Sequence, residues 1–360
     1  MKMLTASDLR EVASVWRRPF TWRQKVNFLH AKLARRGKVV AHQPVTLSIV
    51  ATGRCNLTCT MCPTHSSVIP VDYEWNQQMA EDIDFETFKR TVDRFDRAIY
   101  VNIIGAGEPL LNKNLFRIAK YAAVHKKMVV KTFSNGTTLE RYIEPIVRSH
   151  LDGITVSINA HNSEEFNRIT GMPGLLYPKI YKNVKRLVEA RNALGSPVKI
   201  KASFIIDQQN WPLIPEFLRV ADEVGVDQVF LCNFLSAPFD GFRAEERSLF
   251  VQDTDMVEFL RTVVPSNMQG KVVLPTLLDP AQTTKQCSCH FDQLRVDGAQ
   301  NFSSCSIMLL NMEGNGKITD AEVWNSTFFQ NRRARFLTDD KSVLFDPCKV
   351  CPENYGVNPW

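Results

Sequence analysis

Three cysteines near the N-terminus, Cys55, Cys59 and Cys62, are the residues whose type and spacing best predict chemistry. They lie on one short segment, with three residues between the first two and two between the last two. Thiolates this close can bind three irons of a cubane [4Fe–4S] cluster, because such clusters are held by cysteine sulfur. The fourth iron then has no protein ligand and is open to a substrate or cofactor, which favours an enzyme over an electron carrier. A zinc site completed by His65, or a set of buried free thiols, is the alternative at this point.

The same segment resembles the first cluster site of the radical S-adenosylmethionine (radical SAM) superfamily. Asn56 and Leu57 follow the first cysteine, and Met61 and Pro63 flank the third, as in members with a second cluster. The resemblance implies that S-adenosylmethionine binds the open iron and that one electron cleaves it to methionine and a 5′-deoxyadenosyl radical. That radical takes a hydrogen atom from an unreactive C–H bond. The implied cofactors are therefore a [4Fe–4S] cluster on three cysteines and S-adenosylmethionine, with Met61 among the residues that contact them.

Further segments are similar to the cofactor-binding motifs of this family. Gly105-Ala106-Gly107-Glu108-Pro109 resembles the Gly-Gly-Glu-Pro turn, in which backbone carbonyls and the glutamate region accept hydrogen bonds from the methionine amine. The resemblance and the positions near predicted strands give these candidate cofactor contacts: Gly107, Glu108, Pro109, Ser134, Asn135, Ser157, Asn159, Arg168, Lys201 and Ser203. An ordinary turn, a helix cap or a structural polar contact is the alternative for each of them.

A second group of cysteines, Cys287, Cys305, Cys348 and Cys351, occupies the C-terminal part of the chain. Their order resembles the SPASM and twitch domains of radical SAM enzymes, with an Asp-Gly hairpin between the first two and a final Cys-x-x-Cys pair. His290 replaces the usual proline. No cysteine follows the last pair, so the resemblance is to the shorter twitch type, as in enzymes of the 2-deoxy-scyllo-inosamine dehydrogenase type. It implies one auxiliary [4Fe–4S] cluster bound by these four cysteines.

Two cysteines, Cys232 and Cys289, are left over by this assignment. Cys289 is an alternative to Cys287 as a ligand of the auxiliary cluster, and we favour Cys287 because of its distance from Phe291. Either leftover cysteine could instead donate a hydrogen atom to a substrate radical, as in radical epimerases, so both are candidate catalytic residues. Simple packing is the alternative, since free cysteines are commonly buried.

The elements that must position these residues alternate between short β-rich runs and amphipathic helices. Strands are predicted at residues 45–51, 98–104, 128–133, 153–158, 198–206 and 228–233, with helices between them. We predict an α/β fold: a partial (β/α)6 TIM-like radical SAM barrel with its site at the C-terminal ends of the strands, plus a small C-terminal twitch/SPASM iron–sulfur domain. The predicted domains are a basic helical extension (1–44), the barrel (45–235), a connector (236–285) and the auxiliary-cluster domain (286–360).

Positive charge is concentrated near the N-terminus: residues 1–44 contain ten lysines and arginines but two acids, in a chain with a net charge of +6. Residues 16–38 are predicted to form one basic amphipathic helix, with Trp22, Val26, Leu29 and Leu33 on its apolar face. This helix is expected to cover the barrel floor, or to contact an acidic electron donor, an anionic substrate carrier or a membrane surface. No transmembrane segment or signal peptide is evident, and the cysteine spacing favours metal ligation, so we expect a cytoplasmic protein.

The sequence therefore predicts a radical SAM enzyme with a small-molecule substrate and a flavodoxin- or ferredoxin-type electron donor, and without nucleic acid. The 44 residues before the predicted barrel are few for the peptide-recognition domain of many peptide-modifying members. A small polar metabolite (a sugar, an aminocyclitol or a nucleotide conjugate) is the expected substrate, with net oxidation or redox-neutral rearrangement as the outcome. A peptide- or protein-modifying maturase and a non-enzymatic iron–sulfur electron carrier are the alternatives.

Overall fold

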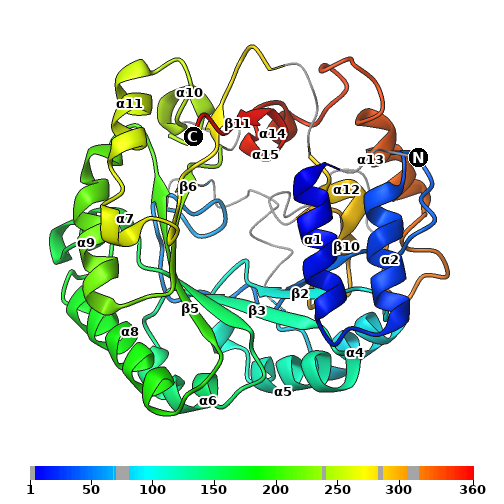
Figure 1. Ribbon diagram of the computed structural model, residues 1–360, viewed down its shortest axis with the longest axis horizontal. Helices are drawn as coiled ribbons and strands as arrows, with labels where there is room; N and C mark the ends of the chain where they lie inside the picture. The colour runs from blue at the N-terminus through cyan, green and yellow to red at the C-terminus, as the bar shows by residue number, and fades with distance from the viewer. Residues whose placement is uncertain (1–4, 68, 70–80, 237–240, 283–286, 306–315) are drawn as a thin grey trace.

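The structure, a computed structural model, describes the chain apart from residues 1–4, 68, 70–80, 237–240, 283–286 and 306–315, and apart from the side chains of residues 346 and 347. Its centre is a mostly parallel sheet that curves into a partial barrel with helices outside it (Figure 1). The order of the strands in this sheet is β10-β9-β1-β2-β3-β4-β5-β6-β7. Their bounds are β1 Thr46–Val50, β2 Tyr100–Ile104, β3 Val129–Ser134, β4 Gly153–Ser157, β5 Lys199–Ile206, β6 Gln228–Asn233, β7 Val272–Val273, β9 Gln293–Val296 and β10 Phe302–Ser303.

The strands β1 to β6 lie where the sequence predicts them, and the predicted α/β partial barrel is confirmed. Each runs parallel to its neighbour, with Leu47 beside Val101 and Thr132 beside Ile154. Burial alternates along β5, because one of its faces packs against the outer helices and the other lines the barrel. The parallel order places the C-terminal ends of these strands at one edge, where the cysteine loop follows β1.

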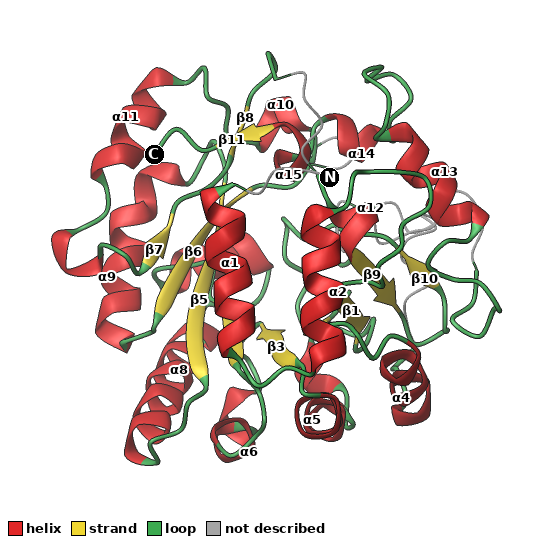
Figure 2. Cartoon of the chain, turned by 45° about the vertical axis from the view of Figure 1, so that its right-hand side comes forward, coloured by secondary structure: helices red, strands yellow, loops and turns green. Residues whose placement is uncertain are grey.

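Helices between the strands cover the outer face of the sheet (Figures 1 and 2). They are α4 Phe85–Arg94, α5 Leu115–Lys120, α6 Ile143–Val147, α7 Ser163–Thr170, α8 Leu176–Ala193 and α9 Ile214–Val224. The Asp84 side chain caps the start of α4 by accepting from the Thr87 N–H, and Gly225 ends α9 in the left-handed conformation. Phe204 and Phe217 stack in the core between sheet and helices, with ring centroids 4.4 Å apart.

The basic N-terminal segment differs from the single helix predicted over residues 16–38. Two helices form instead, α1 Ala6–Arg17 and α2 Trp22–Leu33, and they lie side by side (Figure 2). Pro19 lies between them and cannot continue a helix, while the Thr21 side chain caps the start of α2. Apolar residues of both helices pack near the starts of β1, β2 and β3, in a cluster that includes Val45.

The face that α2 buries also differs from the prediction. Trp22 is 65% exposed, whereas the polar residues Gln24 and Asn27 are buried. Gln24 Nε2 donates to the carbonyl oxygens of Ala98 (2.9 Å) and Lys126 (2.8 Å). Buried backbone carbonyls need such donors, so the helix uses amide side chains where a hydrophobic pattern predicts apolar ones.

The C-terminal part of the chain continues the same sheet. β9 pairs in parallel with β1, and β10 pairs antiparallel with β9 in the hairpin that the Asp-Gly turn predicts. β7, which lies in the predicted connector, pairs in parallel with β6. The domain boundaries predicted at residues 236 and 286 thus coincide with no break in the sheet, and they stay predictions.

Short elements complete the described fold. The helices are α10 Ala244–Arg247, α11 Thr254–Thr262, α12 Cys289–Asp292, α13 Thr327–Arg335, α14 Asp346–Lys349 and α15 Pro352–Tyr355, and β8 Leu277–Leu278 pairs antiparallel with β11 Gly356–Val357. Single 3₁₀ or π turns are Pro109–Leu111, Tyr121–His125, Leu139–Arg141, Trp211–Leu213 and Ser266–Met268. Among the described residues, no helix is both long and apolar enough to cross a lipid bilayer.

Candidate active site

The cysteine loop follows β1, and hydrogen bonds fix the position of its last cysteine. The Cys62 N–H donates to the Cys59 carbonyl oxygen (2.9 Å), and the Cys62 thiol lies 3.1 Å from Thr64 Oγ1 and 3.3 Å from the His65 amide nitrogen. Thr64 Oγ1 also donates to the carbonyl oxygen of Ala106 over 2.8 Å. The loop is therefore attached to the turn that follows β2.

Cys55, Cys59 and Cys62 fit the ligand set of a cubane cluster with one open iron. All three are half-buried. Burial raises the pKa of Cys55 and raises that of Cys59 to about 12, and the charges of neighbouring cysteines add to both shifts. Metal binding offsets this cost, because it holds each cysteine as a thiolate. No three His, Cys, Asp or Glu side chains in the described ranges converge on a single-ion position, whereas a cubane takes each cysteine on a different iron.

The turn after β2 is in direct contact with the cysteine loop. The Gly107 N–H donates to the Thr52 carbonyl oxygen (3.1 Å), and the Glu108 N–H donates to the Arg54 carbonyl oxygen (2.8 Å). A Cβ at position 107 would lie 1.9 Å from that Arg54 oxygen, so this approach requires glycine. Pro109 then begins a 3₁₀ turn. The predicted motif thus lies against the predicted cluster ligands.

The buried carboxylate of Glu108 connects the ends of β2 and β3. Its Oε1 accepts from the Leu110 N–H (3.0 Å), and its Oε2 accepts from the Asn135 N–H (2.6 Å). Burial raises the pKa of Glu108, and these two amide donors oppose that shift. Asn135 Nδ2 donates in turn to Asn56 Oδ1 (2.9 Å), while Ser134 Oγ accepts the amide N–H two residues further on (3.0 Å). These side chains therefore meet beside the cysteine loop.

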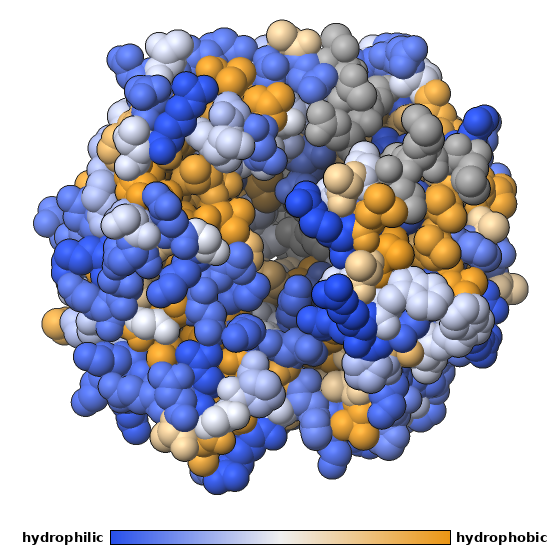
Figure 3. All heavy atoms as spheres, in the orientation of Figure 1, coloured by the Kyte–Doolittle hydropathy of each residue, from blue (hydrophilic) through white to orange (hydrophobic). Residues whose placement is uncertain are grey.

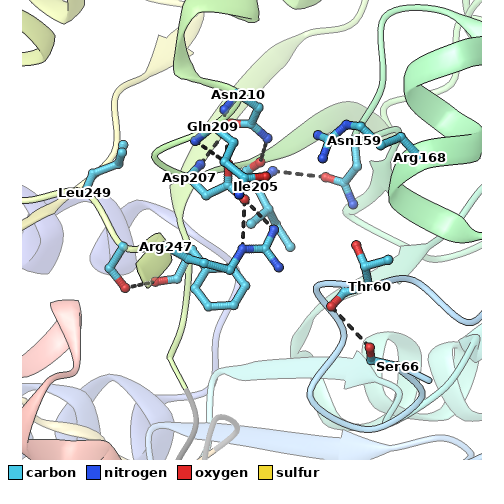
Figure 4. A network of polar contacts seen from close by, with 12 residues as sticks. Thr60, Ser66, Asn159, Arg168, Ile205, Asp207, Gln209, Asn210, Arg247 and Leu249 are labelled. Atoms are coloured by element: carbon cyan, nitrogen blue, oxygen red, sulfur yellow. Dashed lines mark hydrogen bonds and ion pairs between the residues drawn. The ribbon is translucent and has the colours of Figure 1, made fainter. Parts of the chain in front are cut away.

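Two other predicted cofactor contacts, Asn159 and Arg168, form side-chain hydrogen bonds within the protein, and Figure 4 shows that of Asn159. Asn159 Oδ1 accepts from the Ile205 N–H (3.0 Å), and its backbone is left-handed with a φ of 53°. Arg168 donates through two nitrogens to Glu165 (2.8 and 2.6 Å). The segment around Arg168 supports the cysteine loop through its backbone, since the Thr60 N–H donates to the carbonyl oxygen of the next residue, number 169 (2.7 Å).

A buried ion pair at the end of β5 is not predicted by the sequence (Figure 4). Asp207 accepts from Arg247 and from the N–H groups of Gln209 (3.0 Å) and Asn210 (3.1 Å). The Arg247 guanidinium also lies 4.4 Å from the ring centroid of Phe234. The pair fixes the end of β5 and this ring, yet its members are 40 positions apart and carry no local signal.

A cavity of about 520 Å³ lies inside the barrel and reaches the cysteine loop; we call it the lumen. The face shown in Figure 3 is hollowed near its centre, between α1 and β5 of Figure 1. Predicted site residues on the wall of the lumen are Met61, Ser157, Lys201, Ser203 and Cys232. Ser203 Oγ donates to Ser157 Oγ over 3.2 Å. Predicted residues outside this wall are Gly107, Glu108, Pro109, Ser134, Asn135, Asn159 and Arg168.

The two predicted hydrogen-atom donors lie in different places. Cys232 lines the lumen, and burial raises the pKa of its thiol to about 11, with Glu353 adding to the shift. Cys289 is not among the described residues of that wall, and its thiol contacts those of Cys287 and Cys305. The geometry therefore brings Cys232, but not Cys289, to the lumen.

Five cysteines gather in the C-terminal part of the chain. They are Cys287, Cys289, Cys305, Cys348 and Cys351. Burial raises the pKa of Cys348 to about 12 and raises that of Cys351 strongly, and the nearby Cys305 and Cys287 add to both shifts. Since a cubane with no open iron takes four thiolates, this donor set fits a fully ligated auxiliary [4Fe–4S] cluster with one thiol to spare. We call these five residues the auxiliary cysteine group.

Asn354 connects two parts of the auxiliary cysteine group, and sequence reasoning missed it. Its Oδ1 accepts from the Cys287 N–H (3.3 Å), and its Nδ2 donates to the Cys348 carbonyl oxygen (3.0 Å). The side chain is buried. An asparagine three residues after the last cysteine matches no motif, so burial and contacts are the signals that reveal it.

Comparison with known proteins assigns part of the barrel to a family. The family model described as Radical SAM superfamily matches residues 49–200. These residues form a radical SAM domain. The match extends from β1 into β5, so it includes the cysteine loop and the turns after β2 and β3.

Relatives of the radical SAM domain cover different shares of this chain. A pre-heme d1 synthase from Dinoroseobacter shibae is 26% identical over 188 residues, which is 52% of this chain and 42% of that protein. A probable GTP 3',8-cyclase from Saccharolobus islandicus is 23% identical over 261 residues, which is 70% of this chain and 80% of that protein. The chain thus spans less than half the length of the first of these relatives.

The radical SAM domain also has structural relatives. SuiB from Streptococcus suis, solved with S-adenosylmethionine, is similar with a TM-score of 0.65 and 13% identity, over 96% of this chain and 81% of that one. At this identity the similarity shows a shared fold. A radical SAM domain implies a [4Fe–4S] cluster and S-adenosylmethionine as cofactors, and members of the family such as the cyclases are enzymes. The cysteine-rich C-terminal region is consistent with an auxiliary-cluster domain.

Proposed function

We propose that this chain is a radical SAM enzyme that acts on a C–H bond of a small polar metabolite, such as a sugar, an aminocyclitol or a nucleotide conjugate. When bound, the first cluster and S-adenosylmethionine supply a 5′-deoxyadenosyl radical, and the protein supplies position and exclusion of water. The observation that carries the proposal is the lumen, a cavity of about 520 Å³ whose wall includes Met61 and Pro63 of the cysteine loop. Cavities of this size hold small molecules.

The wall of the lumen supports a polar substrate. Asn102, Thr155, Ser157 and Ser203 place amide and hydroxyl groups on it among aromatic and aliphatic side chains. Such groups orient a ligand through hydrogen bonds, while the apolar surroundings exclude water. Cys232 adds a thiol to the same wall, which supports return of a hydrogen atom if the reaction is redox-neutral.

The auxiliary cysteine group supports net oxidation as the other outcome. Four of its thiols would hold one [4Fe–4S] cluster, a group that can accept one electron. Burial raises the pKa of Cys348, and the charges of Arg332 and Arg335 on α13 oppose that shift. Two positive charges therefore lie beside the auxiliary cysteine group, and positive charge favours the arrival of an electron.

We also propose that a flavodoxin- or ferredoxin-type protein supplies the electron for the first cluster. The segment 16–38 is the proposed contact for an acidic partner or a membrane surface. Part of its charge is neutralised within the fold, because Arg18 pairs with Asp152 (3.7 Å) and Lys32 pairs with Glu11 (2.5 Å). Such a contact would therefore depend on the remaining positive residues.

The experiment that tests the enzyme proposal measures 5′-deoxyadenosine made from S-adenosylmethionine by anaerobically reconstituted protein with a reductant. The control is the variant with Cys55→Ala, Cys59→Ala and Cys62→Ala. Product that depends on these cysteines supports the proposal. No product from protein with a fully loaded first cluster, with sugars and aminocyclitols present, would favour the electron carrier instead. A rate raised by short peptides and not by metabolites would favour the maturase.

A further inference from the structure

Lys131 of β3 and Lys201 of β5 give the lumen a positive charge that no described acid on its wall balances. Asp and Glu are absent from the described residues that line it, which are otherwise apolar, aromatic or neutral polar. Within the described part of the chain, the printed contacts of these two lysines are with neutral groups. A cavity with one sign of charge and walls of low dielectric concentrates ions of the opposite sign.

The sheet brings the two lysines to either side of β4. Lys131 is paired with Gly153, and Lys201 is paired with Thr155, two positions further along the same strand. Gly153 is on the wall of the lumen between the two lysines and contributes no side chain there. Neighbouring strands are about 4.8 Å apart, so β3 and β5, with β4 between them, are about 10 Å apart. Two extended lysine side chains can reach one ligand across this distance.

The contacts of each ammonium group leave it able to bind an anion. Lys201 Nζ donates to the neutral Gln228 Oε1 (2.9 Å) and lies 5.0 Å from the ring centroid of Phe230. Lys131 Nζ lies 5.7 Å from the ring centroid of Tyr100. Burial lowers the pKa of Lys201, and the charge of Lys131 lowers it further. A bound anion would offset this repulsion between like charges.

Asp227 is the acid whose charge acts on Lys201 from outside the wall, and it is bound elsewhere. Its Oδ2 accepts from Arg191 Nη1 (2.6 Å) and from the Ile200 N–H (2.8 Å). The carboxylate therefore forms its ion pair with Arg191, and on the lumen side it acts on Lys201 only from a distance.

The two lysines lie away from the cysteine loop. Ile205, four positions after Lys201 on β5, packs in the apolar cluster that contains Met61 of that loop. At about 3.3 Å per residue, Lys201 and Ile205 are about 13 Å apart along the strand. A substrate that reaches both places therefore carries its anionic group well away from the carbon that reacts.

We propose that Lys131 and Lys201 bind the anionic group, a phosphate or a carboxylate, of the metabolite on which this enzyme acts. The inference rests on the proposed function, because it takes the lumen as the substrate site. It names the substrate class: an extended polar metabolite with an anion at one end and the reacting C–H bond towards the other. Lys201, a predicted cofactor contact, is thereby assigned to the substrate.

Isothermal titration calorimetry of the anaerobically reconstituted protein tests the inference with three ligands of one carbon skeleton: ribose 5-phosphate, ribonate and ribose. We expect at least one of the two anions to bind more tightly than ribose. A preference for ribose 5-phosphate assigns a phosphate and a preference for ribonate assigns a carboxylate. Lys131→Gln and Lys201→Gln should each weaken binding of the preferred anion by about tenfold, which corresponds to about 1.4 kcal/mol.

Two further variants make the test specific. Lys199→Gln removes a lysine that is 62% exposed on the same strand but outside the lumen wall, and should leave the affinity unchanged. Lys201→Arg keeps the charge and should retain most of the affinity. Ribose binding as tightly as both anions, no binding of any of the three, or equal losses in Lys199→Gln and Lys201→Gln would each overturn the inference.

The formation of 5′-deoxyadenosine by the same wild-type preparation separates this inference from the proposed function. Cysteine-dependent product without a preference for anions rejects the anion site and leaves the enzyme proposal standing. A preference for anions that depends on both lumen lysines, without such product, supports the anion site and rejects the radical SAM activity.

Discussion

Gly107 shows that the first site depends on the size of a single residue. The turn after β2 donates hydrogen bonds to the cysteine loop at Thr52 and Arg54, and an added Cβ would lie 1.9 Å from the Arg54 carbonyl oxygen. The neighbouring atom is part of the backbone and cannot rotate away as a flexible side chain would. The loop or the turn must therefore move to accept any other residue.

We expect Gly107→Ala to lower both the iron retained at the first site and the rate of 5′-deoxyadenosine formation. Inserting a methyl group into a packed contact costs about 1–3 kcal/mol of stability, and here the displaced segment carries the predicted cluster ligands. The measurements are iron and sulfide content after reconstitution, the rate of product formation and the free energy of unfolding in denaturant.

Gly195→Ala is the matched control for Gly107→Ala. Gly195 has a φ of +59°, but no atom lies within 4 Å of an added Cβ. This variant should lose about 1–2 kcal/mol to backbone strain and keep its iron and its rate. Equal iron loss in the two variants would mean that general destabilisation, and not the contact with Arg54, explains the effect.

The auxiliary cysteine group offers a second test at this scale, because it has one thiol more than a fully ligated cubane takes. Cys287 is fixed through its backbone by Asn354, whose side chain also binds the Cys348 backbone. We expect Cys287→Ala to lose the auxiliary cluster and Cys289→Ala to keep it. Iron content and the electron paramagnetic resonance spectrum of the reduced protein distinguish the two variants. Loss in Cys289→Ala with retention in Cys287→Ala would reverse the assignment.

At the scale of elements, the sequence predicts the strands of the barrel well and the N-terminal helices poorly. Strands β1 to β6 are recognisable because each is a short run rich in apolar and β-branched residues, and their order then brings Glu108, Ser134 and Asn135 together at one edge. The helix α2 is different, because buried Gln24 and Asn27 bind backbone carbonyls of distant segments. A hydrophobic pattern carries no information about which carbonyls need a donor.

This difference predicts that a polar-to-apolar change will destabilise α2 more than the loss of its exposed tryptophan. Gln24→Leu removes the donor to the carbonyl oxygens of Ala98 and Lys126, and each unsatisfied buried group costs about 1–3 kcal/mol. Trp22→Ser removes a side chain that is 65% exposed, and we expect a loss below about 1 kcal/mol. Denaturant unfolding measures both. A larger loss in Trp22→Ser would contradict the buried face that the structure assigns to α2.

At the scale of the whole molecule, the pairing of distant segments is what the sequence does not predict. Two examples are β9, which lies beside β1, and the ion pair of Asp207 with Arg247. Neither has a local signal, because the partners come from separate parts of the chain. The sequence accordingly predicts a separate C-terminal domain, whereas the apolar core of the described residues includes Leu47 of β1 together with Leu294 of β9.

We therefore expect a chain that ends at residue 282 not to fold as an independent barrel. It would lack β9, which pairs with β1 along Thr46–Ile49, and would expose the apolar groups that Leu294 and Val296 cover. Circular dichroism and denaturant unfolding should show no cooperative transition. The 360-residue chain with Cys348→Ala and Cys351→Ala separates the two possible causes, because it lacks two proposed ligands of the auxiliary cluster but keeps β9. If this variant unfolds cooperatively and the shortened chain does not, the sheet and not the cluster joins the barrel to the C-terminal segment. A shortened chain that unfolds cooperatively would instead support the two separate domains that the sequence predicts.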